Sequence, residues 1–240
     1  MNSLIESIKT SFWSCVVYGA MTVVVVLIAY LIEKRIRKET NSTERVLSTR
    51  KIVVIGMFSA IATVLMLFDI PVFFAPSFYK FDFSDLPAMI CGFAYGPVTG
   101  LLIEFIKIML KLVTKGTSTV LIGEFANFMV GAALIIPSSV CYSLKKTKKN
   151  AMLSCILGTV AITVVGGLIN ALFLIPAFAK LYGMPVEAIV EMGSAIIPAV
   201  KDVWTLAFLC AAPLCLLKGV VNSLITMFAY KPLHRILKGN

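Results

Sequence analysis

The chain has a single histidine, His234, and only 12 acidic residues among its 240 positions. Because one histidine in the C-terminal tail cannot build a site elsewhere, we expect no histidine-based metal or acid–base centre among the apolar segments. No GxxxxGK[ST] motif occurs, and Lys115-Gly116-Thr117 has the wrong order for a phosphate-binding loop. The chain is therefore not expected to hydrolyse ATP by that route.

Charge is also scarce, at 14% of residues against about 25% in a soluble domain, while 59% of the residues are hydrophobic. Several apolar runs approach or exceed the roughly 20 residues that span a bilayer. These features predict an all-α integral membrane protein folded as one bundle. The six cysteines lie in or beside apolar runs without a CxxC pair, so we expect small hydrophobic residues and neither disulfides nor a zinc site.

Seven apolar segments are predicted to span the membrane. They are Phe12–Ile32, Ile52–Phe68, Leu86–Tyr95, Val98–Val113, Val120–Tyr142, Ala151–Pro176 and Val203–Tyr230. Residues 69–85 and 177–202 are predicted as loops on one side. The segment Leu86–Tyr95 is short for a span and ends at Gly96-Pro97, which leaves open that it is partly re-entrant.

Basic residues gather in three short stretches beside these segments. Fourteen of the 22 lie in 34–51, 145–149 and 231–238, and all three stretches fall on one side of the predicted topology. Positive residues beside spans mark the cytoplasmic side, where they also meet anionic lipid. We therefore expect a multi-pass cell-membrane protein with its N-terminus outside and its C-terminus cytoplasmic, and no nucleic-acid partner.

Polar residues inside the apolar segments each need a partner or a task, because a charge at the helix centre costs about 2.5–3.5 kcal/mol. Glu104 and Lys107 are three apart and can pair on one helix face. No partner for Lys218 is evident from the sequence. The remaining intramembrane polar residues are Lys111, Glu124, Asn127 and Asn170.

The stretch FYKFDFSD (78–85) alternates aromatic and charged side chains just before an apolar segment. It lies on the same predicted side as Glu124, Asn127 and Asn170. Aromatic walls with a few amide, carboxylate and ammonium groups are typical of a small-molecule pocket. We expect this loop to form the lid and outer wall of such a pocket. Each polar residue taken alone is also explained by a structural hydrogen bond.

Four stretches in series resemble the substrate-binding subunits of energy-coupling factor (ECF) transporters, with the riboflavin-specific members most similar. They are FDFSDLPAMICGFAYGPVTGLLIEFIK, GEFANFMVGAALIIPSS, LINALFLIPAFAKLYGMP and LLKGVVNSLI, within residues 50–237. The resemblance implies a six-helix S-component bundle that binds a vitamin from outside, a separate transmembrane coupling subunit and two cytoplasmic ATPases. On this basis, residues 52–240 form the substrate-binding domain, 34–51 a basic cytoplasmic linker, and 1–33 an extra N-terminal transmembrane helix.

The resemblance also implies the residues of the site. Tyr79, Lys80, Phe81 and Asp82 match the family's loop, and Asn127, Asn170 and Lys218 match polar ligand positions. Asp85 and Glu124 match polar positions for which no direct ligand contact is implied. The chain departs from the family at Leu214-Cys215, where Phe-Asn is common.

A small-residue face at Gly56 and Ala60 suits close helix approach, either for internal packing or, as the resemblance implies, for docking a partner subunit. The expected function is riboflavin binding for import, with riboflavin as transported substrate and no cofactor or metal. Two alternatives stay open: a subunit for another vitamin, or a stand-alone carrier. An enzyme using Glu104 or Asp85 as acid–base group is disfavoured because no nucleophile–base pair has suitable spacing.

Overall fold

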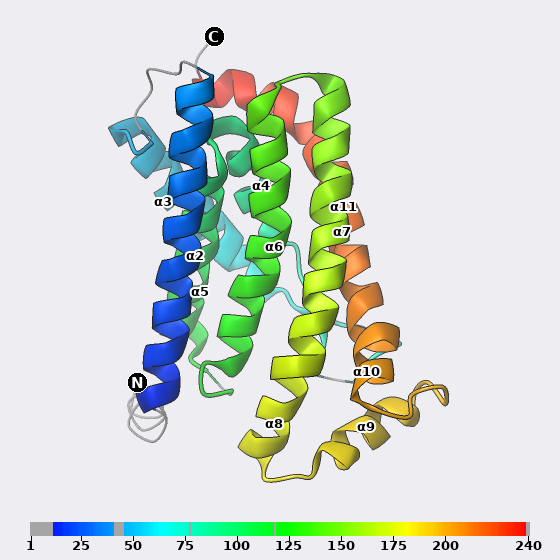
Figure 1. Cartoon of the computed structure of the whole chain (residues 1–240). Helices are drawn as coiled ribbons and strands as arrows, with labels where there is room; N and C mark the ends of the chain where they lie inside the picture. Colours follow the sequence, from blue (N-terminus) through cyan, green and yellow to red (C-terminus); the bar gives the residue numbers. More distant parts are fainter. Residues whose placement is uncertain (1–11, 41–45, 77, 118, 239–240) are drawn as a thin grey trace.

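The structure is a computed structural model that describes residues 12–40, 46–76, 78–117 and 119–238, with side chains described from 16 to 229. It is an elongated helical bundle with one small hairpin (Figure 1). Its elements are α2 (Phe12–Glu39), α3 (Thr49–Leu67), β1 (Ile70–Pro71), β2 (Lys80–Phe81), α4 (Asp85–Tyr95), α5 (Pro97–Lys115), α6 (Ile122–Leu144), α7 (Lys148–Ile169), η1 (Asn170–Leu174), α8 (Ile175–Tyr182), α9 (Val186–Ser194), α10 (Val203–Leu206), η2 (Ala207–Ala211) and α11 (Ala212–Lys238).

The two ends of the bundle differ in the elements they carry. The end with α8 and α9, here called the α9 end, also holds the first described residues of α2 (Figure 1). The other end, here called the basic end, holds the turn between α6 and α7 with Lys145 and Lys146. The turn with Lys145 and Lys146 and the segment 177–202 therefore lie at opposite ends of the bundle, as predicted.

Five helical segments of the described chain are long and apolar enough to cross a membrane: Val16–Glu39, Thr49–Leu67, Ile122–Leu144, Lys148–Tyr182 and Val203–Ala229. The predicted multi-pass helical fold is confirmed. Helix α5 has 19 residues but carries Glu104, Lys107, Lys111 and Lys115. Helix α4 has 11 residues, which at 1.5 Å per residue reach only about 16 Å, roughly half the hydrocarbon thickness.

Helices α4 and α5 meet at a sharp turn made by Gly96 and Pro97. Gly96 has φ +110°, and a Cβ there would lie 2.8 Å from the Glu33 carboxyl carbon. Both the backbone angle and the close approach therefore require glycine. Pro97 occupies the first turn of α5, where its missing N–H leaves no hydrogen bond unmade.

Helix α2 packs against α5 and α6 along one side of the bundle (Figure 1). It continues past the predicted end at Ile32 to Glu39. Glu33 Oε2 accepts a hydrogen bond from the Val98 N–H at 2.9 Å and so caps the start of α5. Toward the α9 end, the Tyr18 ring stacks on Phe125 with centroids 4.8 Å apart. The helix is therefore joined to the bundle at both ends.

Two π-helical turns interrupt the predicted spans Ala151–Pro176 and Val203–Tyr230. In both, five π-helical residues and one further residue precede a proline, Pro176 after η1 and Pro213 after η2. A proline ring clashes with the carbonyl four residues earlier and removes a helical donor, and a wider turn relieves both problems. The predicted loop at 177–202 is also corrected, because it contains the end of α8 and all of α9.

Candidate functional site

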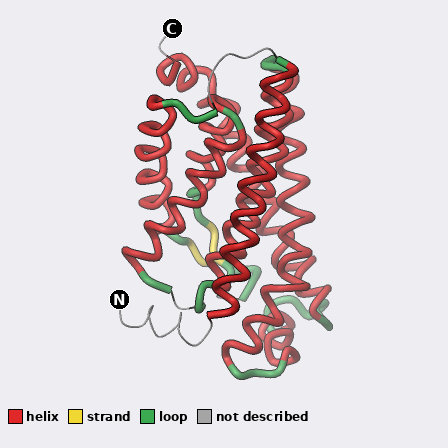
Figure 2. The backbone as a smooth tube through the Cα atoms, turned by 60° about the vertical axis from the view of Figure 1, so that its left-hand side comes forward, coloured by secondary structure: helices red, strands yellow, loops and turns green. Residues whose placement is uncertain are grey.

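A two-stranded hairpin follows α3, and of its four paired residues only Phe81 is buried. Strands β1 and β2 pair antiparallel, with Ile70 opposite Phe81 and Pro71 opposite Lys80. Figure 2 shows the hairpin (yellow) near one end of the helical bundle, and the loop that follows it leads into α4. This arrangement brings the FYKFDFSD stretch into contact with helices from the second half of the chain.

The loop buries its aromatic side chains in an apolar cluster that we call the aromatic cluster. Tyr79 and Phe81 are 5% and 8% exposed, and the Phe78 ring meets Phe178 edge-on with centroids 5.6 Å apart. Residues of α6, η1, α8, α9, α10, η2 and α11 also belong to the cluster; its buried members include Ala126, Ala171, Leu174, Ile175, Phe178, Ile189, Leu206, Ala207, Ala211 and Leu214. Both π-helical turns thus lie in its wall.

Two buried polar atoms at the aromatic cluster have no hydrogen-bond partner among the described residues: the Tyr79 hydroxyl and Asn170 Oδ1. Asn170 opens η1, and its Nδ2 donates to the Gly166 carbonyl at 2.7 Å. Burial raises the pKa of Tyr79, so its hydroxyl stays protonated and can donate. Unpaired buried polar atoms are costly, and these two are free to bind a ligand.

A second group, here called the inner ionic cluster, lies beside the aromatic cluster. It consists of Asp82, Ser84, Asp85, Glu104, Lys107 and Lys218. The Lys107 ammonium lies 2.5 Å from Asp85 Oδ1 and 2.7 Å from Glu104 Oε1, and donates to Ser84 Oγ at 2.7 Å. The predicted pairing of Glu104 with Lys107 is confirmed. The charged side chains of the cluster are at most 8% exposed.

Lys218 of α11 has partners in the loop and in α4. Its Nζ donates to Asp82 Oδ2 at 3.0 Å and lies 4.0 Å from Asp85 Oδ2. Asp82 Oδ1 also accepts from the Ser84 N–H at 2.9 Å and from Ser84 Oγ at 2.5 Å. Although burial opposes ionisation, Lys218 and Lys107 hold the pKa of Asp82 well below its usual range. The pair Asp82–Lys218 therefore ties the loop to the last helix.

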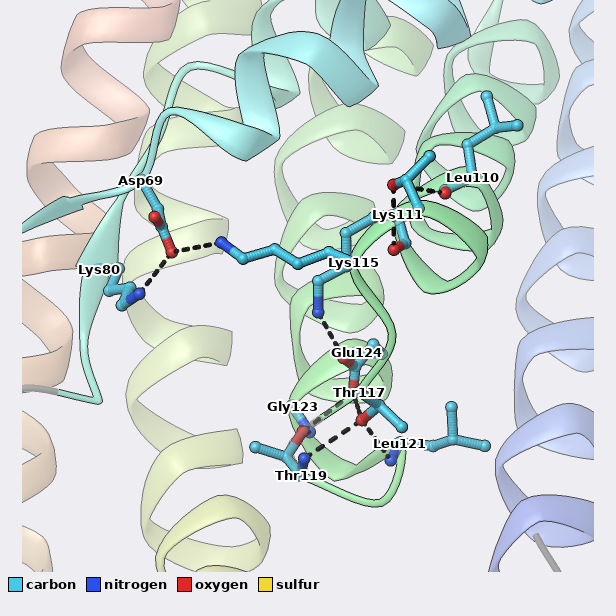
Figure 3. A network of polar contacts seen from close by, with 11 residues as sticks. Asp69, Lys80, Leu110, Lys111, Lys115, Thr117, Thr119, Leu121, Gly123 and Glu124 are labelled. Carbon is cyan, nitrogen blue, oxygen red and sulfur yellow. Dashed lines mark hydrogen bonds and ion pairs between the residues drawn. The ribbon is translucent and has the colours of Figure 1, made fainter. Parts of the chain in front are cut away.

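A third group, here called the outer ionic cluster, consists of Asp69, Lys80, Lys111, Lys115, Thr117, Thr119 and Glu124 (Figure 3). Asp69 accepts from Lys80 at 2.6 Å and lies 3.7 Å from Lys115. Glu124 accepts from Lys111 at 2.5 Å. Two hydroxyl groups also donate to Glu124, those of Thr117 at 3.1 Å and Thr119 at 2.9 Å.

The predicted site residues are thus distributed over three neighbouring groups. Tyr79 and Phe81 lie in the aromatic cluster, with Asn170 in its wall and the half-buried Asn127 on α6 next to Ala126 of the cluster. Asp82 and Lys218 belong to the inner ionic cluster. Lys80 and Glu124 belong to the outer ionic cluster, where each already has a charged partner.

Sequence reasoning missed two features of the site. One is the place of Asp85 and Ser84 in the inner ionic cluster, which only the folded contacts reveal. The other is the pair of π-helical turns. Prolines Pro176 and Pro213, both inside predicted spans, were the available signal.

A cavity of about 380 Å³ lies at the basic end, between α2, α4 and α6. Its lining includes Arg37, Tyr95 and Lys146, and none of its lining residues belongs to the aromatic cluster. It is therefore separate from the predicted ligand pocket.

The small-residue face of α3 points away from the bundle. Gly56 and Ala60 are both exposed, and a Cβ on Gly56 would meet nothing within 4 Å. Neither residue is used for packing within the described chain, which leaves this face available to another helix.

Comparison with known proteins gives consistent results. The family model described as "ECF transporter, substrate-specific component" matches residues 50–230. The chain is 30% identical to riboflavin transporter FmnP of Bacillus subtilis, over 75% of this chain and 89% of that protein. It is also 30% identical to riboflavin transporter RibU of Staphylococcus aureus, over 79% and 93% of the two chains. A solved structure titled as the S component of a bacterial ECF transporter superposes with a TM-score of 0.59 at 30% identity, covering 78% of this chain and 97% of that one.

Proposed function

Because this chain belongs to the family of substrate-specific components of ECF transporters, we propose that it is the riboflavin-binding membrane subunit of an importer of this class. The observation that carries the proposal is the aromatic cluster with its two unpartnered polar atoms, Tyr79 Oη and Asn170 Oδ1. The cluster lies within the matched residues. Relatives named riboflavin transporters match along most of their own length.

Riboflavin suits these groups chemically. Its flat tricyclic ring requires apolar and aromatic walls, while its polar ring edge and ribityl chain require donors and acceptors such as Tyr79, Asn170 and Lys218. Burying about 300 Å² of ring at about 25 cal/mol per Å² gives roughly 7 kcal/mol before the costs of association. The apolar walls would supply most of the affinity and the polar groups the selectivity.

The remaining features support a place in a larger importer. We propose that a transmembrane coupling subunit docks on the exposed face at Gly56 and Ala60, and that two cytoplasmic ATPases supply the energy, since no phosphate-binding loop occurs in this chain. The basic end would face the cytoplasm and the α9 end the outside. In this assembly the chain binds and carries riboflavin and catalyses no reaction.

Titration of the purified protein with riboflavin tests the proposal. We expect bound flavin in the absorbance spectrum of the fresh preparation and quenching of flavin fluorescence on binding. Tyr79→Phe, which removes only a buried hydroxyl, should weaken binding by about 2- to 10-fold. Tyr182→Phe, at an exposed tyrosine of α8, should leave affinity unchanged. A preparation that carries no flavin and does not quench its fluorescence would refute riboflavin as the ligand.

Uptake in cells tests the assembly separately. Cells that lack the ATPases should take up no riboflavin through this chain, whereas a stand-alone carrier would still import it. Gly56→Leu should impair uptake while leaving the affinity of the isolated chain intact, because the leucine would project from the docking face alone.

A further inference from the structure

The inner ionic cluster does not balance its charges. Three carboxyl groups, those of Asp82, Asp85 and Glu104, face two ammonium groups, Lys107 and Lys218. With every group ionised, the cluster carries one excess negative charge.

No other charged side chain of the described residues compensates for this excess. The loop supplies Asp82, α4 supplies Asp85, α5 supplies Glu104 and Lys107, and α11 supplies Lys218 together with the thiol of Cys215. Helix α3 contributes the uncharged Thr63, which donates weakly to the Lys107 carbonyl at 3.5 Å. Helix α6 contributes Gly131, which lies beside Glu104.

Solvent cannot compensate for the excess either. Asp85, Glu104 and Lys107 are each 0% exposed, and Asp82 and Lys218 are 5% and 7% exposed. An uncompensated charge in such surroundings is strongly unfavourable, so the group neutralises or binds a cation. In the part of the chain that the structure describes, no three carboxyl, imidazole or thiol groups are arranged to hold a metal ion. A proton is the cation that the geometry accommodates.

The hydrogen bonds identify the carboxyl group that takes the proton. Asp82 accepts from Lys218 and from two donors of Ser84. Asp85 accepts from Lys107 at Oδ1, while its Oδ2 has no hydrogen-bond partner and lies 4.0 Å from the Lys218 ammonium. Glu104 Oε1 lies 2.7 Å from the Lys107 ammonium, as an ion pair without hydrogen-bond geometry. Its Oε2 has no hydrogen-bond partner either. Its carboxyl faces the backbone of α6, where a Cβ on Gly131 would collide with Oε1.

We propose that the inner ionic cluster is a proton-binding site, in which a proton from the solvent neutralises Glu104, and that its occupancy is linked to ligand binding through Lys218. The first part concerns this chain alone, and the second rests on the proposed riboflavin function. Protonation leaves Asp82 and Asp85 balanced by Lys107 and Lys218. The site then carries no net charge inside the membrane.

The sign of the linkage follows from the geometry. A ligand that accepts a hydrogen bond from Lys218 draws its ammonium away from Asp82 and Asp85. The cluster then becomes more negative and holds the proton on Glu104 more tightly. Ligand binding therefore takes up or retains a proton, and the affinity falls as the pH rises past the point at which the ligand-free cluster loses its proton, by at most about tenfold per pH unit.

Infrared spectroscopy of the purified, ligand-free protein at neutral pH tests the proton site. We expect the carbonyl stretch of a protonated carboxyl group, shifted on exchange into D₂O. Glu104→Gln removes the band by removing the group. Asp85→Asn also removes it, because the cluster is then neutral with Glu104 ionised. Glu124→Gln, at a carboxylate that is buried but fully partnered, retains the band.

The absence of this band in the wild type, or its persistence in Glu104→Gln, would overturn the proposal. If Glu104→Gln fails to fold, Asp85→Asn tests the same proposal, because it leaves Glu104 in place. Persistence of the band in Asp85→Asn would overturn the proposal as well. The infrared result needs no riboflavin and so stands apart from the proposed function.

The linkage is tested by riboflavin affinity from about pH 6 to about pH 9. The wild-type Kd should rise with pH, and that of Glu104→Gln should stay constant. A constant wild-type Kd, or the same slope in both proteins, would overturn the linkage.

Discussion

The inner and outer ionic clusters contain the same chemical groups at similar distances, but they differ in burial and in net charge. Lysine ammonium groups lie 2.5–4.0 Å from carboxylate oxygens in the inner cluster and 2.5–3.7 Å from them in the outer one. In the outer cluster, Lys80 and Lys115 are 45% and 49% exposed, whereas Lys107 is 0% exposed. The distance between the charged atoms of an ion pair therefore does not indicate how much the pair contributes to stability.

The two clusters also differ in the sign of their excess charge. The outer cluster has three lysines and two carboxylates (Figure 3). Because Lys80 and Lys115 are about half exposed, water and solvent ions can balance its excess positive charge. The inner cluster has an excess negative charge and is almost completely buried, with only Asp82 and Lys218 slightly exposed. Protein groups or a proton must balance this charge. Removing one charged residue of the inner cluster should therefore cost more folding free energy than removing its counterpart in the outer cluster.

The largest expected effect is that of Lys107→Met on stability. It leaves Asp85 and Glu104 without their ammonium partner in a buried site, which should destabilise the protein by about 3–5 kcal/mol. Part of the loss should be recovered at acid pH, where Asp85 can be protonated in addition to Glu104. Chemical or thermal unfolding in detergent measures the effect.

The matched control is Lys115→Met in the outer cluster. It removes an ammonium group 3.7 Å from Asp69 at a half-exposed position and should cost less than about 1 kcal/mol. Equal losses for the two variants would abolish the distinction between the clusters.

A second comparison concerns ligand affinity. Lys218→Met removes a charged donor beside the aromatic cluster and should weaken riboflavin binding by about 10- to 100-fold, since a hydrogen bond to a charged group contributes about 1.5–3 kcal/mol. Lys80→Met removes a lysine of the loop that is 45% exposed and pairs with Asp69 in the outer ionic cluster. Because this ammonium is solvated, its loss should change the affinity less than about threefold. Fluorescence titration measures both, and an equal loss would place Lys80 in the ligand site.

How much of the fold and of the candidate site the sequence predicts depends on how far apart in the chain the contacting residues lie. Apolar runs predicted the spans, and the three-residue spacing of Glu104 and Lys107 predicted their pair, because both are local patterns. The partner of Lys218 was not predictable, since Asp82 lies 136 positions away. Lys80 and Glu124 were placed with the ligand residues, and the fold gives each a charged partner that the sequence did not predict.

A smaller effect is expected from the packing around the proton site. Gly131→Ala places a methyl group against the Glu104 carboxyl and should destabilise the protein by about 1–3 kcal/mol. Gly56→Ala, also in a helix but with open space around it, should be neutral or stabilising by up to about 1 kcal/mol, because alanine favours the helix. Thermal unfolding compares the two. A neutral Gly131→Ala would show that Glu104 has room to move aside.

The smallest effect is expected from Asp69→Asn in the outer cluster. Despite some burial, Lys80 and Lys115 lower the pKa of Asp69. A carboxyl group with a lowered pKa adds stability above its ordinary pKa of about 4 and loses that contribution as the pH falls through the lowered value. Because the pair is partly exposed and screened, the variant should lose less than about 0.5 kcal/mol at neutral pH and low salt. The difference should vanish at high salt and at a pH below the lowered pKa of Asp69. Unfolding midpoints at two salt concentrations and two pH values measure it. A loss that persists in high salt would mean that Asp69 is shielded from solvent like Asp82, and the contrast between the two clusters would then be one of degree.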